Sequence, residues 1–450
     1  MLTIPRLLVV SFGATILFGA LLLNHPACWA NREAPVTFLE ALFTSTSAVC
    51  VTGLTVRDTG TAFSTLGIWV VLLLIQAGGL GILTISNLLV LASGRRIGQG
   101  GRMILEETTG VMAHTTPATL LREIIGYTLL IEALGATLLT ARFAIDHPLP
   151  VAAELGIFHS VSAFCNAGFG LFPDNLMSYR GDLLVNSVVM GLIVAGGLGF
   201  VVYADLTHLA RNWRRTPRPK ISLHTRVVMV TTVILIVGGA LVMGALEVAN
   251  PAMGDSFVER LLSPLFLSVT CRTAGFNTVD IGALSNATLL VAILLMAVGG
   301  SPGSTAGGLK TTTLALLHMM ILSRARNRPH VEIFDRTAPP ETVAKALAVT
   351  AGYALAVLAG VVALEVIEAP HLSGLDSRSL FLPHLFEVVS ALGTVGLSTG
   401  ITASLQPGSQ LVIILCMFLG RLGPLIVAAS LVGQAKRLDY TLPREEILVG

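Results

Sequence analysis

The segment Ser390-Ala-Leu-Gly-Thr-Val-Gly-Leu-Ser-Thr-Gly400 decides the fold, because related segments occur three more times in the chain. The anchoring glycine is Gly396 here and Gly53, Gly168 and Gly275 in the other copies, and Leu or Phe follows each one directly. Glycine permits the positive φ that turns backbone carbonyls toward one side. Four such segments around one axis would form rings of carbonyl oxygens able to replace the hydration shell of K⁺.

The three residues that end at each glycine are therefore the predicted K⁺-coordinating backbone, a selectivity filter. They are Val51, Thr52, Gly53, Asn166, Ala167, Gly168, Thr273, Ala274, Gly275, Thr394, Val395 and Gly396. Arg272 lies inside the third segment. A charge in the ion path would block conduction, so we expect Arg272 to brace the back of the filter.

The composition indicates an integral membrane protein. Hydrophobic residues make up 53% of the 450 residues and charged residues only 12%, with a mean hydropathy of +0.80. Soluble proteins contain about 25% charged residues. The net charge of +2 gives no indication of nucleic-acid binding. The five cysteines form no paired framework and are expected in the core or near the pore.

Each quarter of the chain has the same predicted plan. A long apolar helix is followed by a short pore helix, a glycine segment, a polar exit and a second long helix; about 20 apolar residues are needed to cross a bilayer. We therefore expect an all-α membrane fold of four M1-P-M2 repeats, with eight transmembrane helices and four re-entrant pore helices in pseudo-fourfold symmetry around one ion pore. The first helices are predicted at 5–23, 118–141, 226–248 and 343–366, the pore helices at 38–49, 154–164, 257–269 and 382–392, and the second helices at 66–92, 184–209, 286–322 and 409–434.

These patterns define the predicted organisation of the chain. The repeats are 1–93, 118–210, 226–322 and 343–434, the cytoplasmic loops are 94–117, 211–225 and 323–342, and the cytoplasmic tail is 435–450. The apolar run 7–23 after Arg6 could also be a signal peptide. We interpret it as a spanning helix, because the other three glycine segments each have a long apolar helix upstream.

The distribution of basic residues predicts the orientation. The loops and tail, counted as 94–122, 211–226, 323–345 and 435–450, hold 18 of the 28 Lys and Arg residues, and the opposite side holds six. Cytoplasmic loops carry the excess of basic residues. Both termini are therefore expected in the cytoplasm, with the glycine segments entering from outside.

A second glycine motif recurs in the returning helices, 25 to 29 residues after each filter glycine, and close helix packing explains its first two copies. The third copy contains Pro302 and five glycines, which predicts a broken helix with a loop at 299–308. We expect this loop and Arg421, which occupies the equivalent position in the fourth quarter, to form a closed gate. The predicted gate residues are Gly299, Gly300, Ser301, Pro302, Gly303, Ser304, Thr305, Ala306, Gly307, Gly308 and Arg421.

Two other functional classes have weaker support. Gly299-Gly-Ser301-Pro-Gly303 matches the G-x-S-x-G nucleophile motif of hydrolases, but that motif requires a preceding strand and a histidine partner, and its context here is helical. A carrier coupled to Na⁺ or H⁺ would show carboxylates at mid-membrane. The acidic candidates in first helices, Glu132 and Glu365, are expected at the periphery. No Walker-type phosphate-binding loop is present, so an enzyme or an organic cofactor is not expected.

The chain resembles the Trk/Ktr/HKT superfamily of potassium uptake proteins. The resemblance rests on the four M1-P-M2 patterns, the segments ending at the four filter glycines and the 299–308 loop. The resemblance covers nearly the whole chain and is strongest to membrane subunits of the Ktr type. It implies K⁺ uptake across the bacterial cytoplasmic membrane by a multi-pass, channel-like subunit. Relatives that prefer Na⁺ carry serine at the first filter glycine, so Gly53 favours K⁺.

The same resemblance implies partners and co-ions that the residues alone do not indicate. It implies a homodimer of two independent pores in the lipid bilayer, seated on a cytoplasmic KtrA-like ring of nucleotide-binding RCK regulatory subunits. It also implies uptake stimulated by Na⁺. The alternative within the superfamily is a TrkH-like transporter that couples K⁺ to H⁺ or to Na⁺.

Overall fold

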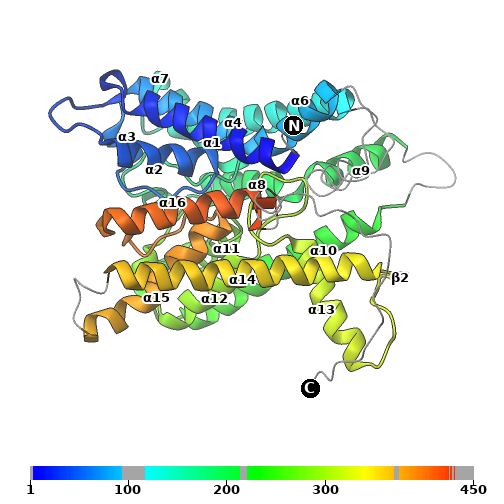
Figure 1. Cartoon of the computed structure of the whole chain (residues 1–450). Coiled ribbons are helices and arrows are strands. Elements are labelled where there is room, and N and C mark those ends of the chain that lie inside the picture. Colours follow the sequence, from blue (N-terminus) through cyan, green and yellow to red (C-terminus); the bar gives the residue numbers. More distant parts are fainter. Residues whose placement is uncertain are drawn as a thin grey trace.

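The computed structural model describes residues 4–93, 117–212, 220–368 and 374–424, together with 426, 427 and 430. Most of the long helices run roughly along one direction (Figure 1). Two-residue strands β1 (Glu332–Ile333) and β2 (Arg336–Thr337) pair in a hairpin between α13 (Thr311–Ala325), which runs across that direction, and α14 (Pro340–Glu368). Three predicted segments lie wholly or partly outside the described residues. They are residues 94–116 of the loop 94–117, residues 213–219 of the loop 211–225, and the tail 435–450.

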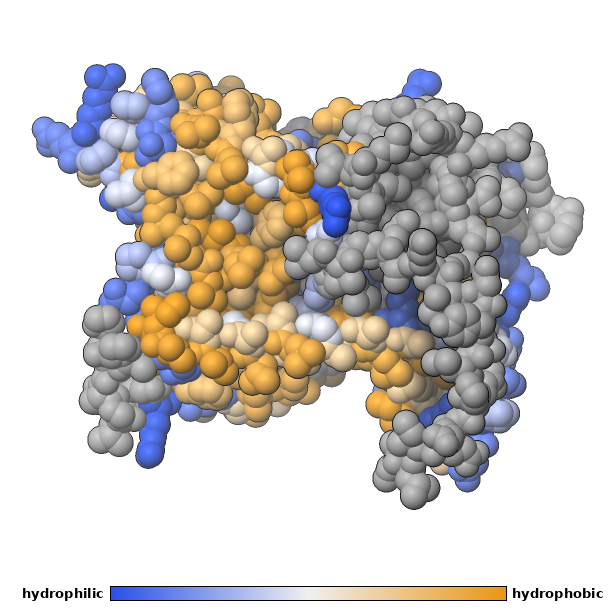
Figure 2. All heavy atoms as spheres, in the orientation of Figure 1, coloured by the Kyte–Doolittle hydropathy of each residue, from blue (hydrophilic) through white to orange (hydrophobic). Residues whose placement is uncertain are grey.

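The predicted first helices are confirmed to within a few residues. They are α1 (Ile4–Leu23), α6 (Pro117–Phe143), α10 (Leu223–Leu246) and α14 (Pro340–Glu368). Each contains a stretch long and apolar enough to cross a membrane, and only 22 to 33% of each stretch is buried inside the protein. Figure 2 shows the matching hydrophobic surface, with hydrophilic residues gathered toward the helix ends.

The short helices before the glycine segments are also present. They are α2 (Phe38–Val49), α7 (Leu149–Phe164), α11 (Phe257–Thr270) and α15 (Gly374–Gly393). Thr37 and Ser256 begin α2 and α11 with complete capping boxes. The helices α7 and α15 begin five and eight residues before the predicted starts.

The first helices pack on the pore helices through small residues. A Cβ atom on Gly19, Gly135 or Gly239 would lie 2.4 to 2.5 Å from a serine hydroxyl of the following pore helix. Those serines, Ser45, Ser160 and Ser268, donate hydrogen bonds to backbone carbonyls of the same first helices. Close helix approach through glycine and interhelical hydroxyl bonds is the usual packing of membrane helices.

The second helices differ from the prediction of four long spans. They are α4 (Thr65–Ser93), α8 (Leu183–Leu198) with α9 (Phe200–Arg211), α12 (Asn286–Ala297) with α13 (Thr311–Ala325), and α16 (Pro407–Leu422). The interruption between α12 and α13 was predicted, and the bend of 96° between α8 and α9 was not. The bend occurs at Gly199, whose φ of +87° is incompatible with a helix. The helix α16 ends in the same way, before Gly423 with a φ of +86°.

By length and composition, the described residues contain four helices able to cross a membrane, or five if the bent pair α8 and α9 is one span. The chain is therefore an all-helical, multi-pass membrane protein. Its core consists of clusters that join the pore helices to the first and second helices of the same quarter and to neighbouring quarters, such as α16 on α2 and α11 on α8.

Candidate functional site

The four glycine segments share an unusual backbone. The residue two positions before each glycine has a positive φ of 51° to 63°, and each glycine has a φ of 72° to 95°. The positive-φ residues before the glycines are Val51, Asn166, Thr273 and Thr394. Left-handed conformations at alternate positions turn successive carbonyls to one side of the chain, as in filters built from backbone oxygens.

The four glycines close a ring. A Cβ atom on any of them would strike a carbonyl oxygen of the next segment at 2.0 to 2.8 Å. In chain order, the oxygens struck belong to Ala167, Ala274, Val395 and Thr52. Because each segment contacts the next and the fourth contacts the first, the four segments form a closed ring at their glycines, and only glycine fits at the contact.

Hydroxyl groups at the ends of the pore helices hold this backbone. The Gly53 and Gly396 N–H groups donate to the hydroxyls of Ser47 and Ser390, at 3.0 and 3.1 Å. In the other two segments, Ser162 and Thr270 donate to the carbonyl that follows the glycine. The pore helices end one to three residues before their positive-φ residues, so the negative ends of the helix dipoles point at the glycine ring.

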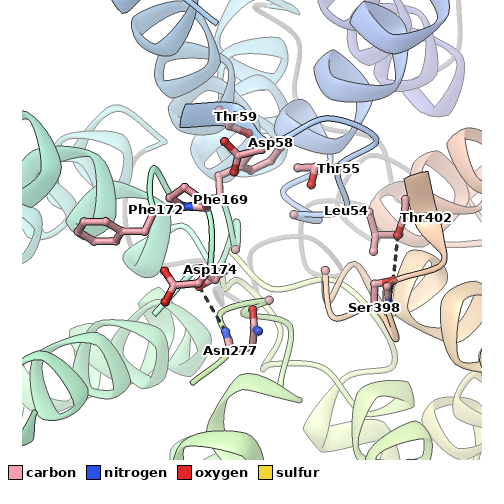
Figure 3. A pocket seen from close by; sticks show the side chains of 18 of the residues that line it. Leu54, Thr55, Asp58, Thr59, Phe169, Phe172, Asp174, Asn277, Ser398 and Thr402 are labelled. Carbon is pink, nitrogen blue, oxygen red and sulfur yellow. Dashed lines mark hydrogen bonds between the residues drawn. The ribbon is translucent and has the colours of Figure 1, made fainter. Parts of the chain in front are cut away.

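One face of the ring opens into a cavity of about 310 Å³, here called the vestibule. Its lining includes all four filter glycines and polar groups from the exits of all four segments. Figure 3 shows Thr55, Asn277, Ser398 and other labelled side chains around this opening. The charged residues that line it in the described chain, Asp58 and Asp174, are both acidic, so the vestibule attracts cations.

The predicted loop 299–308 is present and extends over 298–310, between α12 and α13. It is fastened to the bend in the second quarter: Ser301 N–H donates to the Gly197 carbonyl at 3.0 Å, and Phe200 N–H donates to the Gly303 carbonyl at 3.0 Å. The Thr305 hydroxyl donates to the Phe164 carbonyl at the end of α7. The two bonds between the loop and the bend pair backbone groups that have no partner within a helix.

The loop lies directly against the filter. A Cβ atom on Gly307 would lie 2.2 Å from the Thr394 hydroxyl, and one on Gly299 would lie 3.1 Å from a methyl carbon of Thr273. Arg421, 6% exposed, fastens the loop from the fourth quarter. Its guanidinium donates to the Thr305 carbonyl and, at 2.5 Å, to the Gly78 carbonyl of α4.

A second cavity, of about 280 Å³, lies against the loop and is here called the loop cavity. Its walls are loop residues from Pro302 to Lys310 and parts of α13, α14 and α16, and none of the twelve filter residues lines it. The vestibule and the loop cavity thus lie at the filter and at the loop respectively, and the loop separates the filter from the second cavity.

The structure also shows the contacts of Arg272 and Ser301, for which the sequence made predictions. Arg272 donates to the Thr232 carbonyl of α10 and to the Gly299 carbonyl at 3.1 Å, so it braces the filter against α10 as expected. The Ser301 hydroxyl accepts a hydrogen bond from the Thr311 hydroxyl rather than pairing with a histidine. The hydrolase interpretation of the G-x-S-x-G motif therefore gains no support.

The expectation that Glu132 lies at the periphery is wrong. Its side chain is 5% exposed and lies between Gln76 of α4, at 3.4 Å, and the Cys165 sulfur, at 3.7 Å. Glu365 is half-buried and pairs with the buried His384 at 2.9 Å. Apolar periodicity alone could not locate these groups, because their partners come from other helices. All five cysteines are buried and free.

The contacts at the loop were also beyond sequence reasoning. Lys310 donates from Nζ to the Ala306 carbonyl at 2.7 Å and lines the loop cavity. Its position directly after the glycine-rich loop was the available signal. The bend at Gly199, which receives the loop, had no signal beyond a glycine motif that α4 also contains.

The chain is similar to known cation transport proteins over nearly its whole length. Residues 15–439 match the family model TrkH, described as a cation transport protein. The chain is 36% identical over 450 residues to the Ktr system potassium uptake protein B of Bacillus subtilis, covering 100% of this chain and 97% of that protein. It is 36% identical over 449 residues to the potassium/sodium uptake protein NtpJ of Enterococcus hirae, covering 99% and 97%.

Among solved structures, the chain resembles the potassium transporter TrkH from Vibrio parahaemolyticus. The TM-score is 0.72 at 18% sequence identity, and the match covers 94% of this chain and 83% of that one. At this identity the likeness concerns the fold, which is therefore TrkH-like.

Proposed function

Because the chain belongs to the TrkH family of cation transport proteins, which are transporters and not enzymes, we propose that it mediates K⁺ uptake through one pore at the glycine ring. The observation that carries this proposal is the closed contact of Gly53, Gly168, Gly275 and Gly396, with alternating left-handed backbone in every segment. The names of the relatives, which mention potassium or potassium and sodium, agree with it.

In the proposed mechanism, K⁺ enters the acidic vestibule and loses its water to the filter carbonyls. The twelve filter residues coordinate it through backbone oxygens, and the pore-helix dipoles add negative potential at the same place. The membrane potential drives accumulation, with about 2.3 kcal/mol per charge for each 100 mV. No step requires ATP hydrolysis by this chain.

We further propose that the loop and Arg421 close the pore below the filter. The hydrogen bonds of Arg421 to the Thr305 and Gly78 carbonyls join the loop to α4 and α16. A guanidinium in this place also repels cations. Opening then requires that Arg421 releases Thr305 or that the loop moves away from Thr394.

The proposed architecture is four M1-P-M2 repeats in pseudo-fourfold symmetry, with the filter facing outward and both termini in the cytoplasm of a bacterial cell membrane. The recurrent Gly19, Gly135 and Gly239 contacts with pore-helix serines support the repeats. The basic loops support the orientation. The wider assembly proposed is a homodimer on a KtrA-like, nucleotide-binding RCK ring, with uptake stimulated by Na⁺.

The second candidate is a transporter that couples K⁺ to H⁺ or Na⁺. The buried Glu132 favours it, because an ionisable residue inside a membrane protein is usually functional. A Glu132→Gln variant separates the two: a coupled transporter would lose ion-driven accumulation, whereas a channel-like protein would retain flux driven by the membrane potential.

Growth of a K⁺-uptake-deficient bacterium at low K⁺ tests the main proposal. Expression of the chain should restore growth, and purified protein in liposomes should admit radioactive rubidium when an inside-negative potential is imposed. Failure of both assays with correctly inserted protein would contradict K⁺ uptake. A proton gradient that drives uptake without a potential would support the coupled alternative.

A further inference from the structure

The buried carboxylate of Glu132, inside α6, lies next to the second filter segment. One of its oxygens accepts a hydrogen bond from the Gln76 amide of α4 at 3.4 Å, and the other accepts one from the Cys165 thiol at 3.7 Å. The Cys165 sulfur also lies 3.8 Å from the side-chain oxygen of Gln76. These three side chains, here called the polar cluster, join α4, α6 and the end of α7, which pack against one another (Figure 1).

The position of Glu132 carries an apolar residue in the other three quarters of the chain. Three residues after Glu132, Gly135 packs against a side chain of its pore helix, and the glycines that do the same elsewhere are Gly19, Gly239 and Gly360. The residues three positions before those glycines are Ile16, Ile236 and Val357. All three pack in or against the hydrophobic core. The fold therefore accepts a branched apolar residue at this position, and packing does not require the carboxylate.

Gln76 is a similar polar exception at its own position. Two residues after it, Gly78 packs against a carbonyl at the C-terminal end of its pore helix, and the corresponding glycines in the second and fourth quarters are Gly196 and Gly420. The residues two positions before those glycines are Val194 and Phe418. Gln76 and Glu132 thus come from different quarters, occupy positions that are apolar elsewhere, and contact each other. Burying polar groups is costly, so this pair indicates a role in function rather than in folding.

Cys165 connects the polar cluster to the filter. It is the C-cap residue of α7 and directly precedes Asn166, whose φ of 59° begins the left-handed backbone of the second segment. Its sulfur is also enclosed by α4, because a Cβ atom on Gly79 would lie 2.6 Å from it. Two residues further on, the Ala167 carbonyl is the one that contacts Gly53 in the ring. Holding the Cys165 sulfur therefore fixes the start of a segment that the ring depends on.

We propose that Glu132 is a positioning residue for ion selection, held by Gln76 and acting through Cys165 on the second filter segment. The inference rests on the proposed role of the glycine ring in K⁺ uptake. Selection by a carbonyl filter depends on the number and placement of the coordinating oxygens. A segment that is free to shift at its start loses discrimination between K⁺ and Na⁺ while the pore still conducts. The role uses the hydrogen bonds of Glu132 and not its charge.

The test exchanges each polar residue for the apolar residue found at the corresponding position of another quarter. The variants are Glu132→Ile, Gln76→Val and the double variant, with Glu132→Gln as the conservative change. The matched control is Thr137→Ile, an exposed position of α6 whose hydroxyl donates to the Ala133 carbonyl of the same helix. Two properties of the full-length protein are measured: competition of Na⁺ against rubidium uptake into liposomes, and thermal unfolding in detergent in KCl compared with NaCl.

In Glu132→Ile and Gln76→Val, the preference for K⁺ over Na⁺ should fall about fivefold, the size expected for the loss of one hydrogen bond. The unfolding temperature should stay near the wild-type value, because similar apolar residues fit at the corresponding positions. The double variant should match the single variants, because all three remove the same contact. Glu132→Gln should keep the wild-type preference, since glutamine can accept from the thiol and donate to a rotated Gln76 amide. Thr137→Ile should keep it as well.

A wild-type preference in a folded Glu132→Ile protein overturns the inference, whether or not its unfolding temperature is lower. A loss of preference in Glu132→Gln also overturns it, because the effect would then belong to the charge. If Glu132→Ile does not fold, Gln76→Val is judged by the same criterion.

The unfolding measurement separates this inference from the proposed function. If K⁺ stabilises the wild-type protein but rubidium does not enter liposomes, uptake is contradicted, and the K⁺ and Na⁺ dependence of unfolding in the variants decides the inference alone. If the wild-type protein neither admits rubidium nor is stabilised by K⁺, the proposed function fails and the inference fails with it. Rubidium uptake with an unchanged preference in every variant overturns the inference and leaves the proposed function intact.

Discussion

The Arg421 guanidinium donates a hydrogen bond to the carbonyl oxygen of Thr305, in the loop that separates α12 from α13. Its second nitrogen donates to Gly78 of α4, so one side chain ties together three quarters of the chain. This arrangement satisfies the Thr305 carbonyl and fixes a positive charge at the loop that contacts Thr394. It leads directly to the first prediction.

Arg421→Ala should raise K⁺ flux or remove its regulation, because both the charge and the loop contacts disappear. Rubidium uptake into liposomes measures the effect. Arg421→Lys should give an intermediate flux, since Lys keeps the charge but cannot donate to two carbonyls as a planar fork. Unchanged flux in a well-folded Arg421→Ala protein would rule out the gate role.

Gly53→Ser should weaken the discrimination of K⁺ from Na⁺. A Cβ atom at Gly53 would lie 2.5 Å from the Ala167 carbonyl oxygen, and the φ of +95° disfavours any side chain. The displaced carbonyl should lower the K⁺ to Na⁺ preference by about tenfold, equivalent to about 1.4 kcal/mol. Competition of Na⁺ against rubidium uptake measures it. Gly13→Ser, where nothing lies within 4 Å, should retain wild-type selectivity.

Gly199→Ala should destabilise the protein. The residue has φ +87° and ψ 150°, a region almost restricted to glycine, and a Cβ atom would lie 2.6 Å from the Pro302 carbonyl oxygen. The expected cost is about 1 to 3 kcal/mol, measured as a lower unfolding temperature. Gly191→Ala, inside helix α8 with nothing within 4 Å of a Cβ atom there, should instead be neutral or stabilise by up to about 1 kcal/mol. Equal effects of the two changes would contradict the strained bend.

Glu247 predicts a pH dependence of stability. The carboxylate follows α10 and is buried, which favours its neutral form, but hydrogen bonds from Ser285, Thr288 and Asn250 outweigh this and hold its pKa below the usual value. A lowered folded-state pKa contributes stability above the unfolded-state pKa, and that contribution is lost as the pH falls through the folded-state value.

Glu247→Gln should therefore lower the unfolding temperature at pH 7 and reduce its dependence on acid pH. The measurement is thermal unfolding at neutral pH and at pH values below the ordinary range of a glutamate. The exposed Glu33→Gln is the control and should leave the profile unchanged. A wild-type acid profile in Glu247→Gln would show that this carboxylate does not link α10 to α12 energetically.

The Glu247 contact also belongs to a recurring arrangement that the sequence did not reveal. Glu247 accepts a hydrogen bond from Ser285 N–H, the N-cap of α12, and Glu368 accepts one from Gln406 N–H, the N-cap of α16. The two residues of each pair are 38 positions apart in the sequence. The third and fourth quarters thus join their first and second helices with the same carboxylate contact.

The pore helices and the glycine ring could be predicted because their requirements are local. The bounds of α2, Phe38–Val49, follow from Thr37 and Glu40, a capping box followed by an apolar run. The filter glycines are required wherever carbonyls approach one another closely, so glycine recurs at the same place in all four segments. Hydrophobicity over about 20 residues predicted the spanning first helices.

The bends and contacts around the loop depended on partners distant in the sequence. Gly78-Gly-Leu-Gly81 and Gly196-Gly-Leu-Gly199 are the same tetrapeptide, yet the first lies inside the continuous helix α4 and the second ends α8. At the second copy, the carbonyls of Gly196 and Gly197 accept hydrogen bonds from Thr305 and Ser301 of the loop. The sequence alone determined where glycine permits a break. The tertiary structure decided which copy breaks, because backbone N–H groups of the loop replace the hydrogen bonds that α8 gives up, whereas at the first copy the Gly78 carbonyl of the continuous helix α4 meets the Arg421 side chain.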